Sequence, residues 1–290
     1  MPGGKIVRKL QLFSLHARTE AGPLDYQGLF NFMAGFGPAE RARIVGGRMI
    51  ALGSVRIEGD RVWLHAYEGD IKTDPLFLNV FSGQEHPGKL EPNDVLVQKT
   101  HVLIDTETRN VVVEFNGRGA KAHDIAELLQ TIGLAAPGYR GLELDFNPKA
   151  GEGFIREIER FSRIRIAALK LSRPNFNWTD HRNHLTDMAD QSNGHVIDVS
   201  VFAARDESLE QNHGIVRYIK TLVRDPLSMF KGASVTGVRT NENAETSVSL
   251  GRFIEHRNVK VRRTASGHVV DADIEEEMLH YLESVPPIGE

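Results

Sequence analysis

The sequence predicts an α+β protein of two domains, each a mostly antiparallel mixed sheet with packed helices. The chain has 290 residues, which is long for a single core. Segments with the two-residue period of strands are interleaved with segments of helical period. Pro137-Gly138 follows a helical pattern, as is typical of a boundary. We therefore expect an N-terminal α+β domain over residues 1–137 and a C-terminal α+β domain with basic clusters over residues 138–290.

The most complete local pattern covers residues 95–133. Two runs rich in β-branched residues, 95–104 and 111–115, flank a polar segment and predict a hairpin. An Asn116-Gly117-Arg118-Gly119 turn follows, and then a helical pattern begins. One face of that helix holds Ile125, Leu128, Leu129 and Ile132. Gly133 is expected to stop the helix in a left-handed conformation.

The first ninety-odd residues predict the rest of the N-terminal sheet. Residues 6–15 alternate and predict a first strand, which we expect to pair with the hairpin. A Glu58-Gly59-Asp60 turn joins two further strand patterns. The expected elements are a helix at 24–36, strands at 49–57 and 61–67, a strand or turn at 71–80 and a loop at 82–94.

The remainder of the chain predicts a second set of strands and helices in the order βαβαβαββα. The strands are expected at residues 142–146, 163–172, 196–204, 234–239 and 253–263. The helices are expected at residues 152–161, 178–189, 214–223 and 274–284. Pro286-Pro287 ends the last helix.

Composition excludes several classes. No apolar run approaches the about 20 residues of a membrane span, and the N-terminus lacks the apolar core of a signal peptide. The chain has no cysteine, which excludes disulfides, thiolate metal sites and cysteine nucleophiles. We therefore expect a cytoplasmic protein without a cofactor.

The turn after the hairpin is a candidate phosphate site. Free backbone N–H groups at a helix start, together with Arg118 and Lys121, suit an anion. The turn matches neither the phosphate-loop pattern GxxxxGK[ST] nor the dinucleotide pattern GxGxxG. A plain strand-to-helix turn that needs glycine for its backbone is therefore favoured.

Two enzyme patterns are weak. The first is a possible metal site at His181, His184 and Asp187, which lie at i, i+3 and i+6 of the predicted helix at 178–189. Zinc-binding helices usually place two histidines at i and i+4. A solvated polar helix is therefore favoured, and no metal site is predicted. Asp60 and Asp70-Ile71-Lys72 have the formal spacing of a PD-(D/E)xK nuclease, but Glu68-Gly69-Asp70 is interpreted as a turn where the motif needs a strand. A GxSxG serine nucleophile is absent from the sequence.

Charge is distributed unevenly, although the formal net charge is only −4. Residues 138–263 hold 20 Lys and Arg against 16 Asp and Glu, while residues 271–290 hold acids and no Lys or Arg. The basic residues gather on one predicted helix, with Arg217, Lys220 and Arg224, and on one strand pair, with Arg252, Arg257, Lys260, Arg262 and Arg263. Such rows suit phosphate contacts. An ordinary solvated face is the alternative, because acids neighbour some of the arginines, as Glu157 neighbours Arg156.

Three segments share a layout with a known group of proteins. They are the strand and turn of Val111–Arg118, the strand, helix and strand of Leu142–Asn175, and the closing segment Val269–Ser284. In this layout the chain resembles the family of the phage exclusion protein RexA and related prophage- and defence-associated families. It resembles more distantly the KwaB-like DNA-binding proteins of the Kiwa defence system. The resemblance lies in pattern rather than in diagnostic motifs, and it leaves residues 1–94 unmatched.

The resemblance implies a homodimer that binds double-stranded DNA with little sequence preference and takes part in antiviral defence. The family defines no catalytic residues, so none is carried over. We expect nucleic-acid binding through the two basic rows, with the turn as a helper. The residues are Arg217, Lys220, Arg224, Arg257, Lys260, Arg262 and Arg263, with Arg118 and Lys121.

Two other functions remain open. One is a metal-dependent nuclease or toxin-like effector that uses Asp60 and Asp70. The other is a sensor or interaction subunit that binds a phage component or a partner subunit. Its contact surface would be the acidic last helix, with Asp271, Asp273, Glu275, Glu276 and Glu277, although acids in a first helical turn also simply stabilise the helix dipole.

Overall fold

The chain forms two compact units. The computed structural model describes residues 4–20, 24–45, 48–70, 76–78, 84–88, 94–150, 152–172, 196–224, 230–240, 242 and 244–285. Unit 1 comprises Met1–Gln11, Leu15–Phe146 and Arg257–Glu290. Unit 2 comprises Leu12–Ser14 and Asn147–His256.

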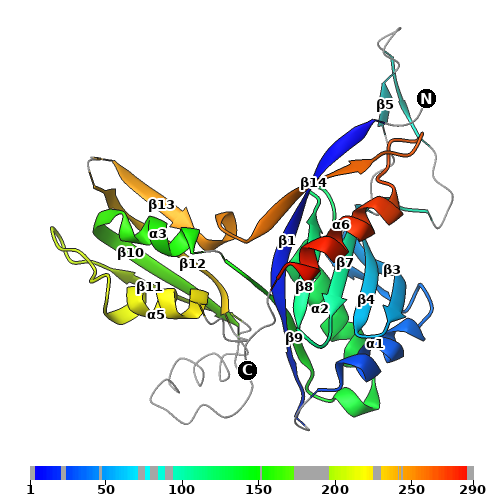
Figure 1. The fold of residues 1–290 in the computed structure, drawn as a ribbon, viewed down its shortest axis with the longest axis horizontal. Helices are drawn as coiled ribbons and strands as arrows, with labels where there is room; N and C mark the ends of the chain where they lie inside the picture. Colours follow the sequence, from blue (N-terminus) through cyan, green and yellow to red (C-terminus); the bar gives the residue numbers. More distant parts are fainter. Residues whose placement is uncertain are drawn as a thin grey trace. The chain divides into compact units, whose positions relative to one another are not determined.

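Unit 1 is built on an eight-stranded sheet of order β14-β1-β8-β7-β4-β3-β2, with β9 also paired to β1 (Figure 1). The strands are β1 (Lys5–Arg18), β2 (Ala42–Val45), β3 (Arg48–Glu58), β4 (Arg61–Asp70), β7 (Leu96–Asp105), β8 (Asn110–Phe115), β9 (Glu143–Pro148) and β14 (His256–Arg262). The pairings from β2 to β8 are antiparallel. A separate antiparallel pair is formed by β5 (Leu76–Leu78) and β6 (Glu85–Pro87).

Three α-helices pack on this sheet. They are α1 (Tyr26–Ala34), α2 (Ala122–Gly133) and α6 (Asp271–Glu283), and a 3-10 turn η1 (Pro137–Tyr139) follows α2. α1 and α2 contact each other and β3, whereas α6 lies over β7 and β8 (Figure 1). The helical spacing in the sequence explains the packing, because Leu29, Phe30 and Met33 of α1 and Ile125, Leu129 and Ile132 of α2 are buried together with the apolar strand residues.

Unit 2 is a four-stranded antiparallel sheet of order β11-β10-β12-β13. Its strands are β10 (Phe161–Ser172), β11 (Val196–Phe202), β12 (Phe230–Arg239) and β13 (Glu245–Ser249). The helices α3 (Gly153–Glu159) and α5 (Gly214–Arg224) contact β10, and a 3-10 turn η2 (Leu250–Arg252) follows β13. The core contains Phe154, Ile158, Ile164, Ile219 and Phe230.

The α+β fold class with two antiparallel sheets is confirmed. The hairpin β7–β8, the pairing of β1 with that hairpin, and the helices α2, α5 and α6 agree with the sequence pattern. The short strands β2, β6 and β13 were not predicted. The predicted helix at 178–189 lies outside the described residues.

The two units differ from the predicted division at residues 137 and 138. Unit 1 continues to Phe146 and also takes Arg257–Glu290, which the sequence pattern assigned to the second domain. The physical reason is pairing between distant segments: β14 joins the sheet beside β1, and α6 packs on β7 and β8.

Gly133 is not a left-handed helix stop. It is buried as the last residue of α2, and the following Leu134 has φ −62°, in the right-handed region. A Cβ atom at Gly133 would lie 2.3 Å from Cδ2 of Leu142 and 3.0 Å from Cδ1 of Leu29. The glycine therefore serves close packing of α2 against its neighbours.

We expect Gly133→Ala to lower the free energy of unfolding by about 1–3 kcal/mol, because the added methyl overpacks a filled core. Gly138→Ala is the control, since a Cβ atom there meets nothing within 4 Å and it should change stability by less than about 0.5 kcal/mol. Urea denaturation of both variants measures the difference. Equal stability of the two variants would contradict the packing role of Gly133.

Candidate functional site

A row of polar side chains crosses the sheet of unit 1 beneath α6. β4 and β7 pair His65 with His101, and β7 and β8 pair Val102 with Val113. Extending the second register by one residue places Glu114 beside His101. Residues paired across antiparallel strands point to the same face, so His65, His101 and Glu114 form one row. Arg8 of β1 extends the row, with its Nε 3.3 Å from Oε1 of Glu114.

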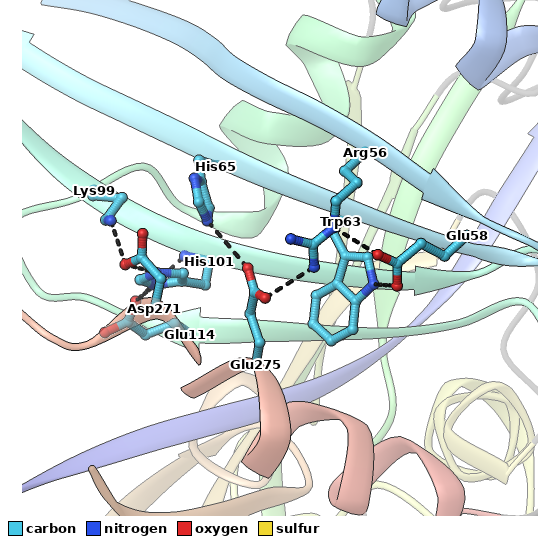
Figure 2. A network of polar contacts seen from close by, with 9 residues as sticks. All are labelled: Arg56, Glu58, Trp63, His65, Lys99, His101, Glu114, Asp271 and Glu275. Atoms are coloured by element: carbon cyan, nitrogen blue, oxygen red, sulfur yellow. Dashed lines mark hydrogen bonds and ion pairs between the residues drawn. The ribbon is translucent and has the colours of Figure 1, made fainter. Parts of the chain in front are cut away.

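His101 is held between two carboxylates. Its Nδ1 lies 2.7 Å from Oε2 of Glu114, and its Nε2 lies 3.0 Å from Oδ1 of Asp271 (Figure 2). The side chains of His101 and Glu114 are only 3% and 2% exposed. Both ring nitrogens of His101 therefore have a carboxylate oxygen within hydrogen-bond distance.

The first residue of α6 completes this arrangement. Oδ1 of Asp271 also lies 2.5 Å from Nζ of Lys99, which neighbours His101 on the same face of β7. An acid at a helix start is favourable because it faces the positive end of the helix dipole. Asp271 therefore binds α6 to the sheet through Lys99 and His101.

A second contact follows one turn later on α6. Oε2 of Glu275 accepts from Nη2 of Arg56 at 2.9 Å, and its Oε1 lies 3.6 Å from Nε2 of His65 (Figure 2). The Arg56 guanidinium also stacks 5.3 Å from the ring centroid of Trp63. Nε1 of Trp63 donates to Glu58 at 3.2 Å. The network runs from Glu114 to Glu58 along one face.

The pKa values in the network follow from these contacts. Burial lowers the pKa of His65, and the positive charges of His101 and Lys99 lower it further, against the opposing effect of Asp271 and Glu275. Burial on its own raises the pKa of Asp271, but hydrogen bonds from Lys99 and His101 outweigh it, so the net shift is downward. The Asp271 contribution to stability is thus present above pH 3.8 and is lost as the pH falls through its lowered folded value.

This arrangement can hold a proton or a cation. One ligand atom from each of His65, His101 and Asp271 lies within 4.8 Å of the others. Two imidazole nitrogens and a carboxylate oxygen are ligands of first-row transition metals.

The sequence did not predict His65, His101 or Glu114 as part of a site, and it named Asp271 only within an acidic contact surface on the last helix. His101 and Glu114 are polar residues within two apolar strands of one hairpin. The hairpin register alone pairs them, so this signal was present in the sequence. His65 and Asp271 come from β4 and α6, whose placement depends on contacts distant in sequence.

The predicted basic stripe of α5 is only partly exposed. Arg217 and Arg224 are exposed, and among the described residues neither has an ion pair. Lys220 is buried and points toward α3, where its Nζ lies 3.4 Å from Oε1 of Glu159. We name the exposed residues Arg217, Thr221 and Arg224 the α5 stripe. Lys220 is not part of it, because position 220 falls on the apolar side of the helix.

Some basic residues near β14 are likewise paired within the chain, and others are exposed. Arg262 is bound by Asp273, with Nη2 and Oδ1 2.5 Å apart, and the side-chain and backbone hydrogen bonds of Arg262 lower the pKa of Asp273 to about 2. Arg257 lies over the ring of Tyr281, 4.7 Å from its centroid, and donates to Ser284. Lys260 and Arg263 are exposed, and within the described part of the chain they have no acidic partner. Arg252, which the sequence also placed in this group, is exposed in η2 of unit 2.

In the turn before α2, the Lys121 ammonium is hydrogen-bonded to the backbone of the turn itself. Nζ of Lys121 donates to the carbonyl oxygens of Asn116 and Gly117 at 2.6 and 2.7 Å. The N–H of Lys121 donates to the carboxylate of Asp124, so an acid of the chain itself already sits at the helix start. Arg118 alone remains exposed. Lys121 is therefore engaged within the turn, and Arg118 is the cation of this turn that stays available to an anion.

The predicted nuclease acids do not assemble. Asp60 precedes β4 and Asp70 ends it, so about 30 Å of extended strand separates them. Glu68-Gly69-Asp70 belongs to the strand and is not a turn. Lys72, His181, His184 and Asp187 lie outside the described residues.

Most of the acidic residues at the start of α6 form ion pairs within the chain. Asp271, Asp273 and Glu275 bind Lys99, Arg262 and Arg56 respectively. Glu276 is exposed and Glu277 is half-buried. The first acids of α6 therefore fix the helix to the sheet and do not form an open acidic surface.

No model of a known protein family and no curated protein matches the chain. Across the described ranges, no helix has both the length and the apolar character needed to cross a membrane. Fold and site together define a two-unit α+β protein with a buried histidine–carboxylate network in one unit and an exposed arginine stripe in the other.

We expect Glu114→Ala to destabilise the protein by about 3–5 kcal/mol, because it leaves the buried His101 and the half-buried Arg8 without their carboxylate. Glu20→Ala removes a carboxylate from the exposed pair with Arg140 and should cost less than about 1 kcal/mol. Urea denaturation of both variants measures the free energies. A cost for Glu114→Ala as small as for Glu20→Ala would show that the buried pair does not hold the sheet.

We expect the lowered pKa of His65 to make stability depend on pH. The unfolded chain takes up this proton near pH 6.5 and the folded chain only at lower pH, so stability decreases as pH falls from 6.5 through the folded value. Denaturation of wild type and His65→Gln at about pH 8 and about pH 5 tests this. The variant should lose less stability over that interval, and an identical loss would contradict the assignment.

Proposed function

We propose that the chain is a non-enzymatic, cytoplasmic protein that binds double-stranded DNA with little sequence preference and acts in phage exclusion or another form of antiviral defence. The observation that carries the proposal is the α5 stripe, where Arg217 and Arg224 are exposed and lack an ion pair within the described residues. The defence role rests on the resemblance to the RexA family. A homodimer, and contact with a phage component or partner subunit, belong to the same proposal.

The stripe suits phosphate for physical reasons. Arg217, Thr221 and Arg224 lie at i, i+4 and i+7, so they share one face of the helix over about 10 Å. Guanidinium groups bind phosphate oxygens in a bidentate manner and stay charged at any physiological pH. The buried side of the helix, with Val216, Ile219 and Val223, anchors it to the core of unit 2. The helix thus presents to solvent two arginines that have no ion pair within the described part of the chain.

Unit 1 has exposed cations of its own. Lys260 and Arg263 lie at and just after the end of β14, and Arg118 lies in the turn before α2. Contacts of this kind go to the DNA backbone and carry no sequence information, which supports binding of low specificity. Cations on the outer strand of a sheet also discourage edge-to-edge association, so Lys260 has a structural explanation as well.

The test is fluorescence anisotropy with a random duplex of about 30 base pairs at about 50 mM salt, where phosphate contacts are strong. Wild type should bind DNA at micromolar protein. In the double variant Arg217→Glu/Arg224→Glu, the magnitude of the slope of log K against log salt should decrease by about 2. Lys220→Met should bind as wild type does, because Lys220 is buried.

The matched control is Arg43→Glu/Arg140→Glu, which makes the same change in net charge at exposed positions of unit 1. It should retain most of the affinity. The absence of any binding by wild type at micromolar protein would overturn the proposed function. Equal loss in the two double variants would overturn the α5 stripe as the site and leave only a general charge effect.

A further inference from the structure

We propose that His65, His101 and Asp271 form a binding site for a divalent first-row transition-metal ion, with Zn²⁺ as the best match. One ligand atom from each residue lies within 4.8 Å of the other two. Two imidazole nitrogens and one carboxylate oxygen form the set of three protein ligands with which zinc sites leave one position for water. The proposal is independent of nucleic-acid binding, since it concerns the face of the unit 1 sheet beneath α6.

The two imidazoles are positioned by the sheet itself. His65 and His101 occupy directly opposed positions on β4 and β7, and their ring centroids lie 4.9 Å apart in an edge-to-face arrangement. Figure 2 shows both rings on the same side of the strands, toward α6. Ligands carried by paired strands keep their spacing better than ligands carried by loops.

Glu114 fixes the orientation of the His101 ring that a metal ion would need. A histidine that binds a metal through one ring nitrogen typically contacts a carboxylate or carbonyl through the other, which fixes the ring and raises its basicity. Here Nδ1 of His101 lies 2.7 Å from Oε2 of Glu114, and both side chains are almost fully buried. Arg8 holds the other oxygen of Glu114 at 3.3 Å. Nε2 of His101 is thereby directed at Asp271 and the candidate site.

A positive charge competes with a metal at this position. Nζ of Lys99 lies 2.5 Å from Oδ1 of Asp271, the same oxygen that lies 3.0 Å from Nε2 of His101. An ion bound to Asp271 has to replace the contact with Lys99, whose side chain is partly exposed. Removal of the Lys99 charge should therefore strengthen binding.

The candidate site reaches solvent at Asp271, the first residue of α6. The side chain of Asp271 is 42% exposed, which provides access from solvent. Oε1 of Glu275 lies 3.6 Å from Nε2 of His65, one helical turn after Asp271. A fourth ligand can thus be water or Glu275, and the mixed nitrogen and oxygen set favours transition ions over Mg²⁺ or Ca²⁺.

The experiment titrates ZnCl₂ into full-length protein that carries no polyhistidine tag and has been treated with a chelator. Calorimetry measures the stoichiometry, and the visible spectrum of added CoCl₂ reports the coordination of a tetrahedral nitrogen and oxygen site. We expect one ion per chain. His65→Ala and Asp271→Asn should each weaken binding by more than about tenfold, since even supporting residues of metal sites cost 10- to 100-fold.

Lys99→Met is the variant that distinguishes a metal site from a purely structural ion-pair network. It should bind Zn²⁺ more tightly than wild type does, whereas a network without a metal role gains no affinity from it. His123→Ala is the matched control, because His123 is exposed beside a carboxylate of Asp124 and lies outside the site. Circular dichroism verifies that each variant is folded. Absence of one-to-one binding by wild type, or binding that is unchanged in both His65→Ala and Asp271→Asn, would overturn the proposal.

Discussion

The contact between His101 and Glu114 is the constraint on which the rest of unit 1 depends. Two ionisable groups that are both almost fully buried cost a large desolvation free energy unless every polar atom is satisfied. Glu114 satisfies one nitrogen of His101 from within the hairpin, and the other nitrogen faces away from β8. Asp271 supplies the missing acceptor, so the start of α6 is fixed over β7.

This requirement explains why the C-terminal segment belongs to unit 1. Asp271 and Glu275 lie one turn apart on α6, and they reach Lys99 and Arg56, which come from β7 and β3. Burial of Ile274, Met278 and Leu282 on the same helix adds apolar contact with the sheet. Polar and apolar contacts thus act together, and α6 closes the face of the sheet that α1 and α2 leave uncovered.

Patterns that are complete within a short stretch of the sequence predict the elements that form within that stretch. The β-branched runs around Asp105–Asn110 predict the hairpin, and the spacing of Ile125, Leu129 and Ile132 predicts α2, because both patterns are complete within a short window. The pair of His101 and Glu114 follows from the same hairpin register. His65 and Asp271 do not, since strand order and helix docking are decided by contacts between segments far apart. The division into two units differs from the predicted boundary at residues 137 and 138 for the same reason.

The same distinction governs the basic residues. Counting positive charge treats every Lys and Arg as available to a ligand, but the fold assigns many of them to partners within the chain. Lys220 binds Glu159, Arg262 binds Asp273, and Lys121 closes its own turn. A phosphate that recruited such a cation would first have to break these contacts, so it gains less from it than from an unpaired arginine. Helical phase alone identifies the α5 stripe: Val216, Ile219 and Val223 define the buried side, and position 220 falls with them, whereas Arg217 and Arg224 do not.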